Sequence, residues 1–181
     1  MEFQKSENTN DLSVRSEALK KMKEFAALDL VSFISEVSRN KKLALLSMED
    51  KNISMLKKKS GFSVLQTAIG SHEEAGLLLL EKPELAKLPD FFVRPIIFYA
   101  AEKHKEVAVK IFLNHPEYLT WKMNDVELTD EEKEMNGWSL NSEARKITLK
   151  EHIYSTQGKI DINPKIVEEI KEELTRLLKK L

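Results

Sequence analysis

The chain has 181 residues, of which 41% are hydrophobic and 33% are charged, and its formal net charge is -1. Because it contains only 5 Gly and 5 Pro, helices joined by short loops are favoured over many short strands. The absence of cysteine excludes disulfides, thiol nucleophiles and cysteine-ligated zinc, and the near-zero charge with 24 Lys against 5 Arg argues against a nucleic-acid partner.

Residues 1–10 are polar, and we expect them to be flexible. They lack the apolar segment of a secretory signal. No apolar run elsewhere in the chain approaches the roughly 20 residues that span a bilayer. We therefore expect a cytoplasmic protein that has no membrane partner.

Residues 11–29 are predicted to form the first helix. Asp11 or Ser13 can cap its N-terminus, because a short oxygen-bearing side chain accepts hydrogen bonds from the first free N–H groups. Apolar residues recur at approximately helical spacing and form the stripe Leu12, Val14, Leu19, Met22 and Phe25. This stripe predicts that one face of the helix packs on the helices that follow.

The segments "SHEEAGLLLL" (71–80) and "KHKEVAVKIF" (103–112) carry similar residues 32 positions apart. The similarity extends upstream, where Ser63 is predicted to cap one helix and Pro95 to occupy the first position of the equivalent helix. A weaker third copy lies another 32 residues upstream, beginning at Val31. The chain is therefore predicted to repeat a pair of helices.

The repeat divides residues 30–155 into four units and one acidic insertion, which we place at 124–136. The units lie near 31–60, 61–92, 93–123 and 137–155. An amphipathic helix is predicted at 163–181, capped by Asp161 or Asn163. Its apolar stripe is Val167, Ile170, Leu174, Leu177 and Leu181.

A period of about this length is typical of arrays of stacked supersecondary units. One helix pair cannot cover its own apolar face, so each copy buries the face of its neighbour. We therefore predict an all-α fold, a short α-solenoid of three to four helix pairs. The N- and C-terminal helices are predicted to act as caps whose outer faces are polar.

The repeated residues resemble those of ankyrin repeats. "AAEKHKEVAVKIFL" (100–113) looks like the middle of an ankyrin repeat, and "GFSVLQTAI" (61–69) is similar to the entry into its first helix. The chain departs from the family at the Thr-Pro-Leu-His entry, at the Gly-His spacing between the helices and at the Asp-Gly of the loop tips. Tetratricopeptide repeats are the alternative, but their Trp, Gly and Tyr landmarks do not align with this sequence.

The resemblance implies a non-catalytic protein–protein interaction module that needs no cofactor or metal. Ankyrin-like arrays bind a protein partner through their loops and through the concave face formed by the first helices. Aromatic and arginine side chains are frequent anchors of such interfaces. The residues expected to contact the partner are Phe92, Arg94, Tyr99, Lys103, Trp121 and Trp138. The C-terminal stripe is too short for a convincing coiled coil, which favours a monomer over a dimer.

Two other functions stay open. A small metal- or acid–base-dependent enzyme would use His104 or His115 with an acid from 125–134, although no carboxylate-rich pocket is recognisable around these residues. A nucleic-acid binder would use Lys57–Lys59. We interpret His72 and His104, at equivalent repeat positions, as structural residues that close the turn within each helix pair by a backbone hydrogen bond.

Overall fold

The computed structural model describes residues 6–58, 61–130 and 146–157. Within these ranges every regular element is helical, and extended pairing is limited to isolated bridges. The elements are α1 (Ser6–Leu28), α2 (Leu30–Arg39), α3 (Lys41–Ser47), α4 (Lys51–Met55), α5 (Val64–Ser71), α6 (Glu73–Leu80), α7 (Pro83–Ala86), α8 (Ile96–Lys103), α9 (Lys105–Asn114), the 3-10 helix η1 (Pro116–Thr120) and α11 (Leu149–Gln157). The prediction of an all-α protein is confirmed for these ranges.

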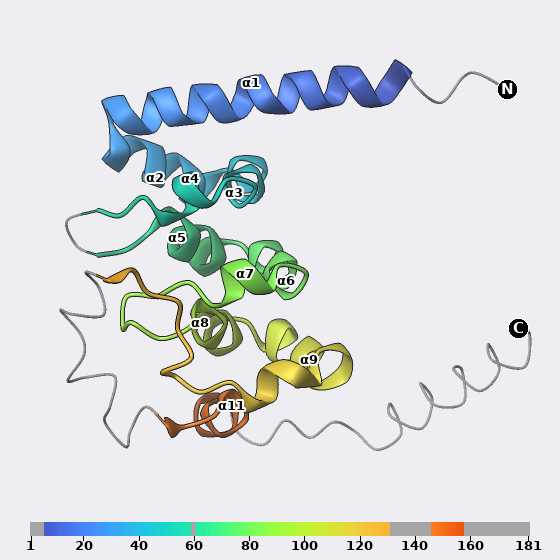
Figure 1. The fold of residues 1–181 in the computed structure, drawn as a ribbon, viewed down its shortest axis with the longest axis vertical. Coiled ribbons are helices and arrows are strands. Elements are labelled where there is room, and N and C mark those ends of the chain that lie inside the picture. Colours follow the sequence, from blue (N-terminus) through green and yellow to red (C-terminus); the bar gives the residue numbers. More distant parts are fainter. Residues whose placement is uncertain (1–5, 59–60, 131–145, 158–181) are drawn as a thin grey trace, which may run out of the picture.

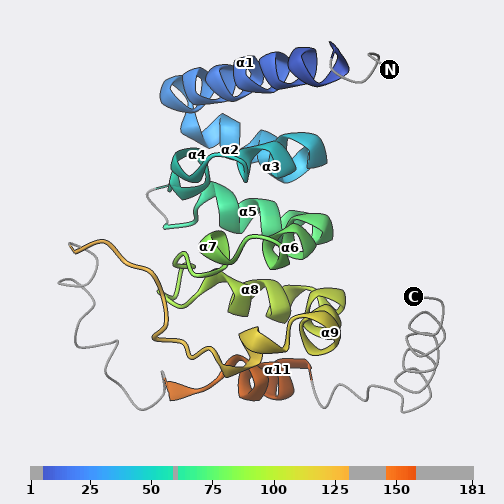
Figure 2. The ribbon, with the colours of Figure 1, turned by 45° about the vertical axis from the view of Figure 1, so that its right-hand side comes forward.

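The helices stack in chain order, from α1 at one end to α11 at the other (Figure 1). The layers keep this order when the molecule is turned (Figure 2). Helix α2 packs on α5, α5 on α8, and α8 on α11. Alongside them, α3 packs on α6 and α6 on α9. The described chain therefore contains two adjacent columns of helices, α2–α5–α8–α11 and α3–α6–α9, with α1 laid over one end.

Polar side chains fix where several helices begin. The Ser63 hydroxyl accepts a hydrogen bond from Gln66 N at 3.0 Å, which confirms Ser63 as the cap of α5. Carboxylate and amide side chains do the same at the starts of α2, α3 and α4, and these caps are Asp29, Asn40 and Asp50. Each cap satisfies N–H groups that have no partner within the helix.

A hairpin-like connection joins each layer to the next. The first hairpin spans 56–63 and the second 88–95, and the third connection, 121–148, is described at its two ends. Their antiparallel bridges are Lys57–Ser63, Pro89–Pro95 and Lys122–Thr148. Because Pro95 belongs to its bridge, it lies one residue before α8 and not at the first helical position that was predicted for it.

The core runs through both columns. The predicted faces of α2, α5 and α8 are at most 1% exposed, and they comprise Phe33, Ile34, Val37, Val64, Leu65, Ala68, Ile69, Ile96, Ile97, Ala100 and Ala101. The second column packs closely at Gly76 of α6, where an added Cβ would lie 2.9 Å from Val107 of α9. Ala44 and Ala108 occupy the equivalent positions in the neighbouring layers and are fully buried. Small residues at this position therefore let α3, α6 and α9 approach one another.

Hydrogen bonds between layers recur with the repeat period. The last carbonyl groups of an α-helix have no partner within the helix. The carbonyl oxygen of Val37, near the end of α2, accepts from His72 Nε2 at 3.0 Å. The carbonyl oxygen of Ile69, near the end of α5, accepts from His104 Nε2 at 2.6 Å. Each histidine makes the expected kind of bond, but it bonds to the preceding layer and not to the turn within its own pair.

The last layer uses a glutamine for the same contact. Gln157 Nε2, at the end of α11, donates to the carbonyl oxygen of Ala101 at 3.1 Å. Ala101 lies 32 residues after Ile69 and occupies the equivalent position of α8. Helix α11 therefore docks on α8 in the way that the preceding layer docks on α5.

Helix α1 differs from its prediction in its N-terminal half. It begins at Ser6 and not near Asp11, because no Gly or Pro interrupts the preceding residues. Met22 is buried, as expected, whereas Leu12 and Val14 are 63% and 61% exposed. This half of α1 extends beyond the layer below it (Figure 1), so among the described elements no helix covers Leu12 and Val14.

The described part of the acidic insertion runs back along the stack. Glu127 N donates to the carbonyl oxygen of Lys87 at 2.8 Å, just before the second hairpin. The Glu127 carboxylate also lies 3.1 Å from Lys51 Nζ of α4. The remainder of the insertion, the first part of the fourth unit and the helix at 163–181 lie outside the described residues.

The second hairpin contains a strained residue. Val93 has φ 58°, which a β-branched residue rarely adopts, whereas the equivalent residue of the first hairpin is Gly61, with φ 88°. We expect Val93→Asn to raise the free energy of unfolding by about 1 kcal/mol, because Asn tolerates this conformation. Urea denaturation measures the change. Val93→Ala retains a Cβ without the tolerance of Asn, and an equal gain from alanine would contradict this explanation.

The layer-to-layer hydrogen bond of His104 can be tested in the same way. We expect His104→Ala to lower the free energy of unfolding by about 1–3 kcal/mol, because it leaves a buried carbonyl group without a partner. His115→Ala is the matched control, since that ring bonds to the exposed side chain of Glu117 and lies beside the Tyr118 ring, and it does not bond to a backbone carbonyl group of another layer among the described residues. Equal losses in the free energy of unfolding from the two substitutions would show that the hydrogen bond to Ile69 makes no special contribution to stability.

Candidate functional site

Three exposed phenylalanine rings meet on the first two hairpins. Phe62 belongs to the first hairpin and Phe91 and Phe92 to the second, and the three are 41%, 44% and 60% exposed. The rings of Phe62 and Phe91 stack, with centroids 5.0 Å apart and planes at 15°. Phe92 meets Phe91 edge-on, with centroids 5.3 Å apart. We call these three residues the aromatic cluster.

Buried polar groups fix the backbone of the aromatic cluster. Phe91 N donates to the side-chain oxygen of Gln66 at 2.9 Å, and Gln66 is only 1% exposed. Phe92 N donates to the carboxylate of Asp90 at 2.9 Å. Gly61 is needed beneath the stack, because a Cβ there would lie 3.0 Å from the Phe91 ring and because its φ of 88° favours glycine. These contacts hold the backbone from which the Phe91 and Phe92 rings project.

A network of charged groups lies next to Phe92. Arg94 Nε donates to Asp90 at 2.6 Å, and Arg94 Nη2 donates to Glu102 of α8 at 2.8 Å. Arg94 Nη1 donates to His152 Nε2 of α11 at 3.3 Å. The guanidinium also lies 5.3 Å from the centre of the Phe92 ring, in cation–π contact. We call Asp90, Arg94, Glu102 and His152 the Arg94 network, and it ties the second hairpin to two layers.

Burial and the Arg94 charge set the protonation of this network. Burial raises the pKa of Asp90, although Arg94 and two backbone N–H groups act in the opposite direction. Burial also lowers the pKa of His152, and the neighbouring guanidinium acts in the same direction. Burial acts to raise the pKa of Glu102, but the hydrogen bond and charge of Arg94 outweigh it and the pKa is lowered. A neutral His152 can therefore accept the hydrogen bond from Arg94 Nη1.

The predicted contact residues differ in how much surface they present. Phe92 and Lys103 are exposed, and Tyr99 is half-buried, with its hydroxyl 2.5 Å from where a Cβ on Gly70 would lie. The side chain of Arg94 is 9% exposed and is engaged by its network. Arg94 therefore presents little surface to a partner, and its structural effect is to position Phe92.

Trp121 and Trp138 were both predicted to contact a partner, and the structure describes only the first of them. Trp121 is half-buried and packs edge-on against Tyr118, with ring centroids 4.6 Å apart. Lys87 Nζ lies 5.1 Å from the centre of the Trp121 ring. Trp121 therefore contributes to packing at the end of η1, and its removal affects stability as well as any partner contact. Trp138 lies outside the described residues.

Sequence reasoning missed Phe62 and the Arg94 network. Phe62 carries a weak signal, since it is a large apolar residue between Gly61 and Ser63 in a turn segment. The network has no local signal. His152 lies 58 residues after Arg94, and only the docking of α11 on α8 brings the two together.

The two histidines proposed for an enzyme lie apart, and part of the acidic segment proposed to act with them, 131–134, lies outside the described residues. His104 and His115 flank α9 at opposite ends, and His104 is occupied by the carbonyl group of Ile69. Across 6–58, 61–130 and 146–157, no three His, Asp or Glu side chains are grouped so as to hold a metal ion. Among these same residues, no helix combines the length and apolar character needed to cross a membrane.

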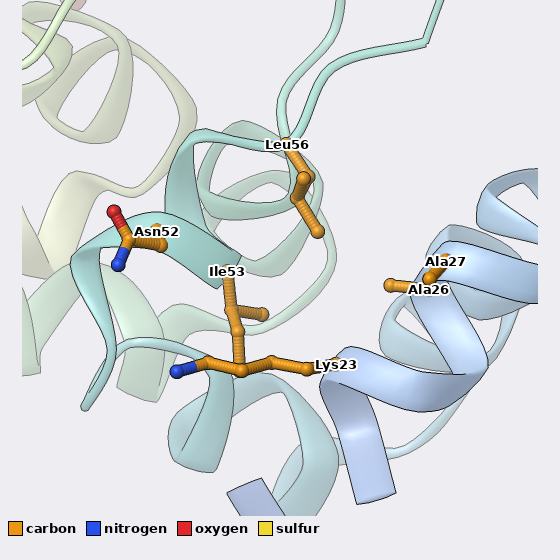
Figure 3. A pocket seen from close by; sticks show the side chains of 6 residues that line it. All are labelled: Lys23, Ala26, Ala27, Asn52, Ile53 and Leu56. Carbon is orange, nitrogen blue, oxygen red and sulfur yellow. The ribbon is translucent and has the colours of Figure 1, made fainter. Parts of the chain in front are cut away.

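A small hollow of about 280 Å³ lies between α1 and α4. Ile53 and Leu56 face Ala26 across it (Figure 3). The Lys23 ammonium, at its rim, forms an ion pair of 2.5 Å with Asp50. The hollow is therefore lined mainly by apolar side chains, with Lys23 and Asn52 as its polar groups.

No protein-family model, curated protein or solved structure matches this chain.

The pKa of His152 gives the Arg94 network a measurable pH dependence. Because burial lowers this pKa below its ordinary value of 6.5, the unfolded chain binds more protons than the folded chain just below that value. We expect the free energy of unfolding to fall as the pH decreases below about 6.5. Urea denaturation between pH 7.5 and 5.5 measures this slope.

His152→Gln is the control for the pH experiment, because glutamine does not titrate. The slope should be smaller in this variant. The contribution of Glu102 is lost only below its ordinary value of 4.5, since its pKa is lowered, and so it falls outside the chosen range. Identical slopes in the two proteins would contradict the placement of His152 beside Arg94.

Proposed function

We propose that the chain is a helical-repeat scaffold that binds another protein and catalyses no reaction. The support is the recurrence of bridges, helix starts and layer-to-layer hydrogen bonds at an offset of 32 residues. In this proposal the units near 31–60, 61–92 and 93–123 are ankyrin-like helix pairs. Helix α1 covers the first unit as its cap.

The fourth unit of the proposed array contains α11. Its support is the bond from Leu149 N to Trp121 O at 2.7 Å, which repeats the 2.8 Å bond from Ile96 N to Leu88 O. Gln157 adds the layer-to-layer contact made by histidine in the earlier units. Residues 124–136 are then an insertion in the connection that precedes this unit.

The aromatic cluster carries the proposed function. Exposed apolar groups cost free energy in water, and large exposed patches commonly mark interaction sites. Here three rings are exposed while buried polar groups and a left-handed glycine hold them in place. Such preorganisation lowers the entropy lost on binding. A partner that covers these rings gains the burial of three large apolar side chains, which are the anchors that dominate many interfaces.

The other predicted contact residues extend this surface. Lys103 and Tyr99 lie on α8, the helix that follows the second hairpin. We propose that they form the edge of the contact, whereas Arg94 positions Phe92 from the buried side. Trp121 supports the third connection through its packing on Tyr118. Trp138 stays a sequence-based proposal.

Substitution of the cluster tests the proposed function. We expect Phe91→Ser with Phe92→Ser to reduce partner capture at least about 10-fold, because loss of a large buried anchor costs 1 kcal/mol or more. The protein is used as bait in lysate of its source organism, and captured proteins are quantified by mass spectrometry. Circular dichroism checks that the variant is folded.

Val14→Ser is the matched control for this experiment. Val14 is 61% exposed, close to the 60% of Phe92, but it lies in the N-terminal half of α1. At least one protein should be captured equally by the wild type and by Val14→Ser and lost with the double variant. Capture that is the same for all three baits would contradict the assignment of the site.

A further inference from the structure

After Trp121 the chain turns back along the stack. Asp125 N donates to the carbonyl oxygen of Lys122 at 3.0 Å, and Lys122 N donates to the Asp125 carboxylate at 2.8 Å, which closes the turn. The residues that follow run past α8 on the side of the hairpins (Figures 1 and 2). We call residues 121–130 the strap.

The strap lies on the stack with one side inward. Leu128 is 8% exposed and Val126 is half-buried, whereas Glu127, between them, is exposed. Alternate side chains of an extended segment point to opposite sides. The side chains of Val126 and Leu128 therefore anchor the strap, and Glu127 reaches the neighbouring elements from its outer side.

Glu127 connects the strap to the roots of both hairpins that carry the aromatic cluster. Its backbone N donates to the carbonyl oxygen of Lys87 at 2.8 Å, one residue before the second hairpin begins. Its carboxylate lies 3.1 Å from Lys51 Nζ of α4, the helix that ends at Met55 and leads into the first hairpin. One residue of the strap therefore bridges two hairpins that belong to different layers.

The contact with Lys51 also skips layers. Units of a repeat stack contact mainly their neighbours, and Phe91 follows this rule when it stacks on Phe62 and bonds to Gln66. Glu127 and Lys51, by contrast, are 76 residues apart, and the strap that joins them belongs to the third connection. The first two hairpins are thus joined near their tips by the rings and at their roots by the strap.

From these contacts we infer that the strap is a releasable clamp, which fixes the spacing of the first two hairpins and with it the arrangement of the aromatic cluster. When the strap is seated, one residue holds both roots. When it leaves, the described contacts between the two hairpins are those near their tips. This inference goes beyond the proposed function, because it concerns how the hairpins are held whether or not the cluster binds a protein.

The strap can leave the stack without unfolding a layer. Its ion pair joins side chains that are 53% and 51% exposed, and exposed pairs contribute little to stability. The hairpins keep their own hydrogen bonds, which include Val64 N to Leu56 O and Ile96 N to Leu88 O, both at 2.8 Å. Segments held by few buried contacts open locally while the rest of a protein stays folded.

Amide hydrogen exchange followed by NMR tests the clamp. Exchange is measured for the wild type and for Glu127→Pro, Leu128→Ala and Glu127→Gln. Proline removes the N–H group and the carboxylate together, and alanine removes the apolar anchor without changing the backbone groups. Glutamine is the matched control, because it keeps the N–H group and a side chain that can still accept a hydrogen bond from Lys51. Leu128→Ala decides the question if the proline variant does not fold.

Four amides serve as reporters. Those of Val64 and Ile96 close the two hairpins, and we call them the hairpin reporters. Those of Leu79 in α6 and Ile111 in α9 belong to fully buried residues of the second column, and we call them the stack reporters. The second column lies on the other side of the stack from the hairpins (Figure 1), so the stack reporters detect opening of the whole fold.

We expect Glu127→Pro and Leu128→Ala to speed exchange at both hairpin reporters at least about 3-fold, as for the loss of one hydrogen bond or a modest buried contact. The stack reporters should be unchanged. Glu127→Gln should stay within about 2-fold of the wild type, because an exposed ion pair contributes little. In the wild type, Glu127 N should exchange faster than all four reporters.

Three results would contradict the clamp. Unchanged hairpin reporters in both Glu127→Pro and Leu128→Ala would mean that the strap rests on the hairpins without holding them. Equal acceleration of the hairpin and stack reporters would mean that the strap contributes only to global stability. Exchange of Glu127 N as slow as that of the stack reporters would mean that the strap is not released. All three leave the scaffold proposal standing, since the capture experiment tests that proposal separately.

Discussion

The carbonyl groups at the C-terminal ends of α2, α5 and α8 need partners that their own helices cannot supply. The next layer supplies them, through His72, His104 and Gln157. A layer that slid or rotated relative to its neighbour would lose this bond and leave a buried acceptor unpaired, at a cost of about 1–3 kcal/mol. The apolar faces drive the layers together, and these directional bonds fix their register. The hairpins and the surface they carry depend on that register.

The aromatic cluster is a consequence of stacking and not of any one layer. Phe62 stands on one hairpin and Phe91 on the next, and they meet because two successive layers present their hairpins at the same edge. Gln66 then connects the two layers by accepting from Phe91 N. The Arg94 network extends the connection to α8 and α11. Three layers therefore hold the backbone of this surface in place.

The sequence predicted correctly those features that are set by residues close to one another in the chain. Ser63 caps α5 as predicted, and the buried faces of α2, α5 and α8 follow from apolar spacing, because capping and amphipathic patterns involve residues within two turns of each other. The sequence did not predict which residues are buried where that burial depends on distant segments of the chain. Arg94 was expected at the surface, but α11 covers it from 58 residues away. Leu12 and Val14 fit a helical stripe, yet whether any layer covers them depends on how far α1 extends beyond its neighbours.

The layer-to-layer bonds can be observed directly by NMR of the histidine rings. A long-range ¹H–¹⁵N correlation spectrum near neutral pH distinguishes the two imidazole tautomers and detects slowly exchanging ring protons. The account predicts that His72 and His104 are both protonated at Nε2, with protons protected from exchange, and that His115 is not protected. Protonation of His72 and His104 at Nδ1 alone, or exchange as fast as that of His115, would contradict the register of the stack.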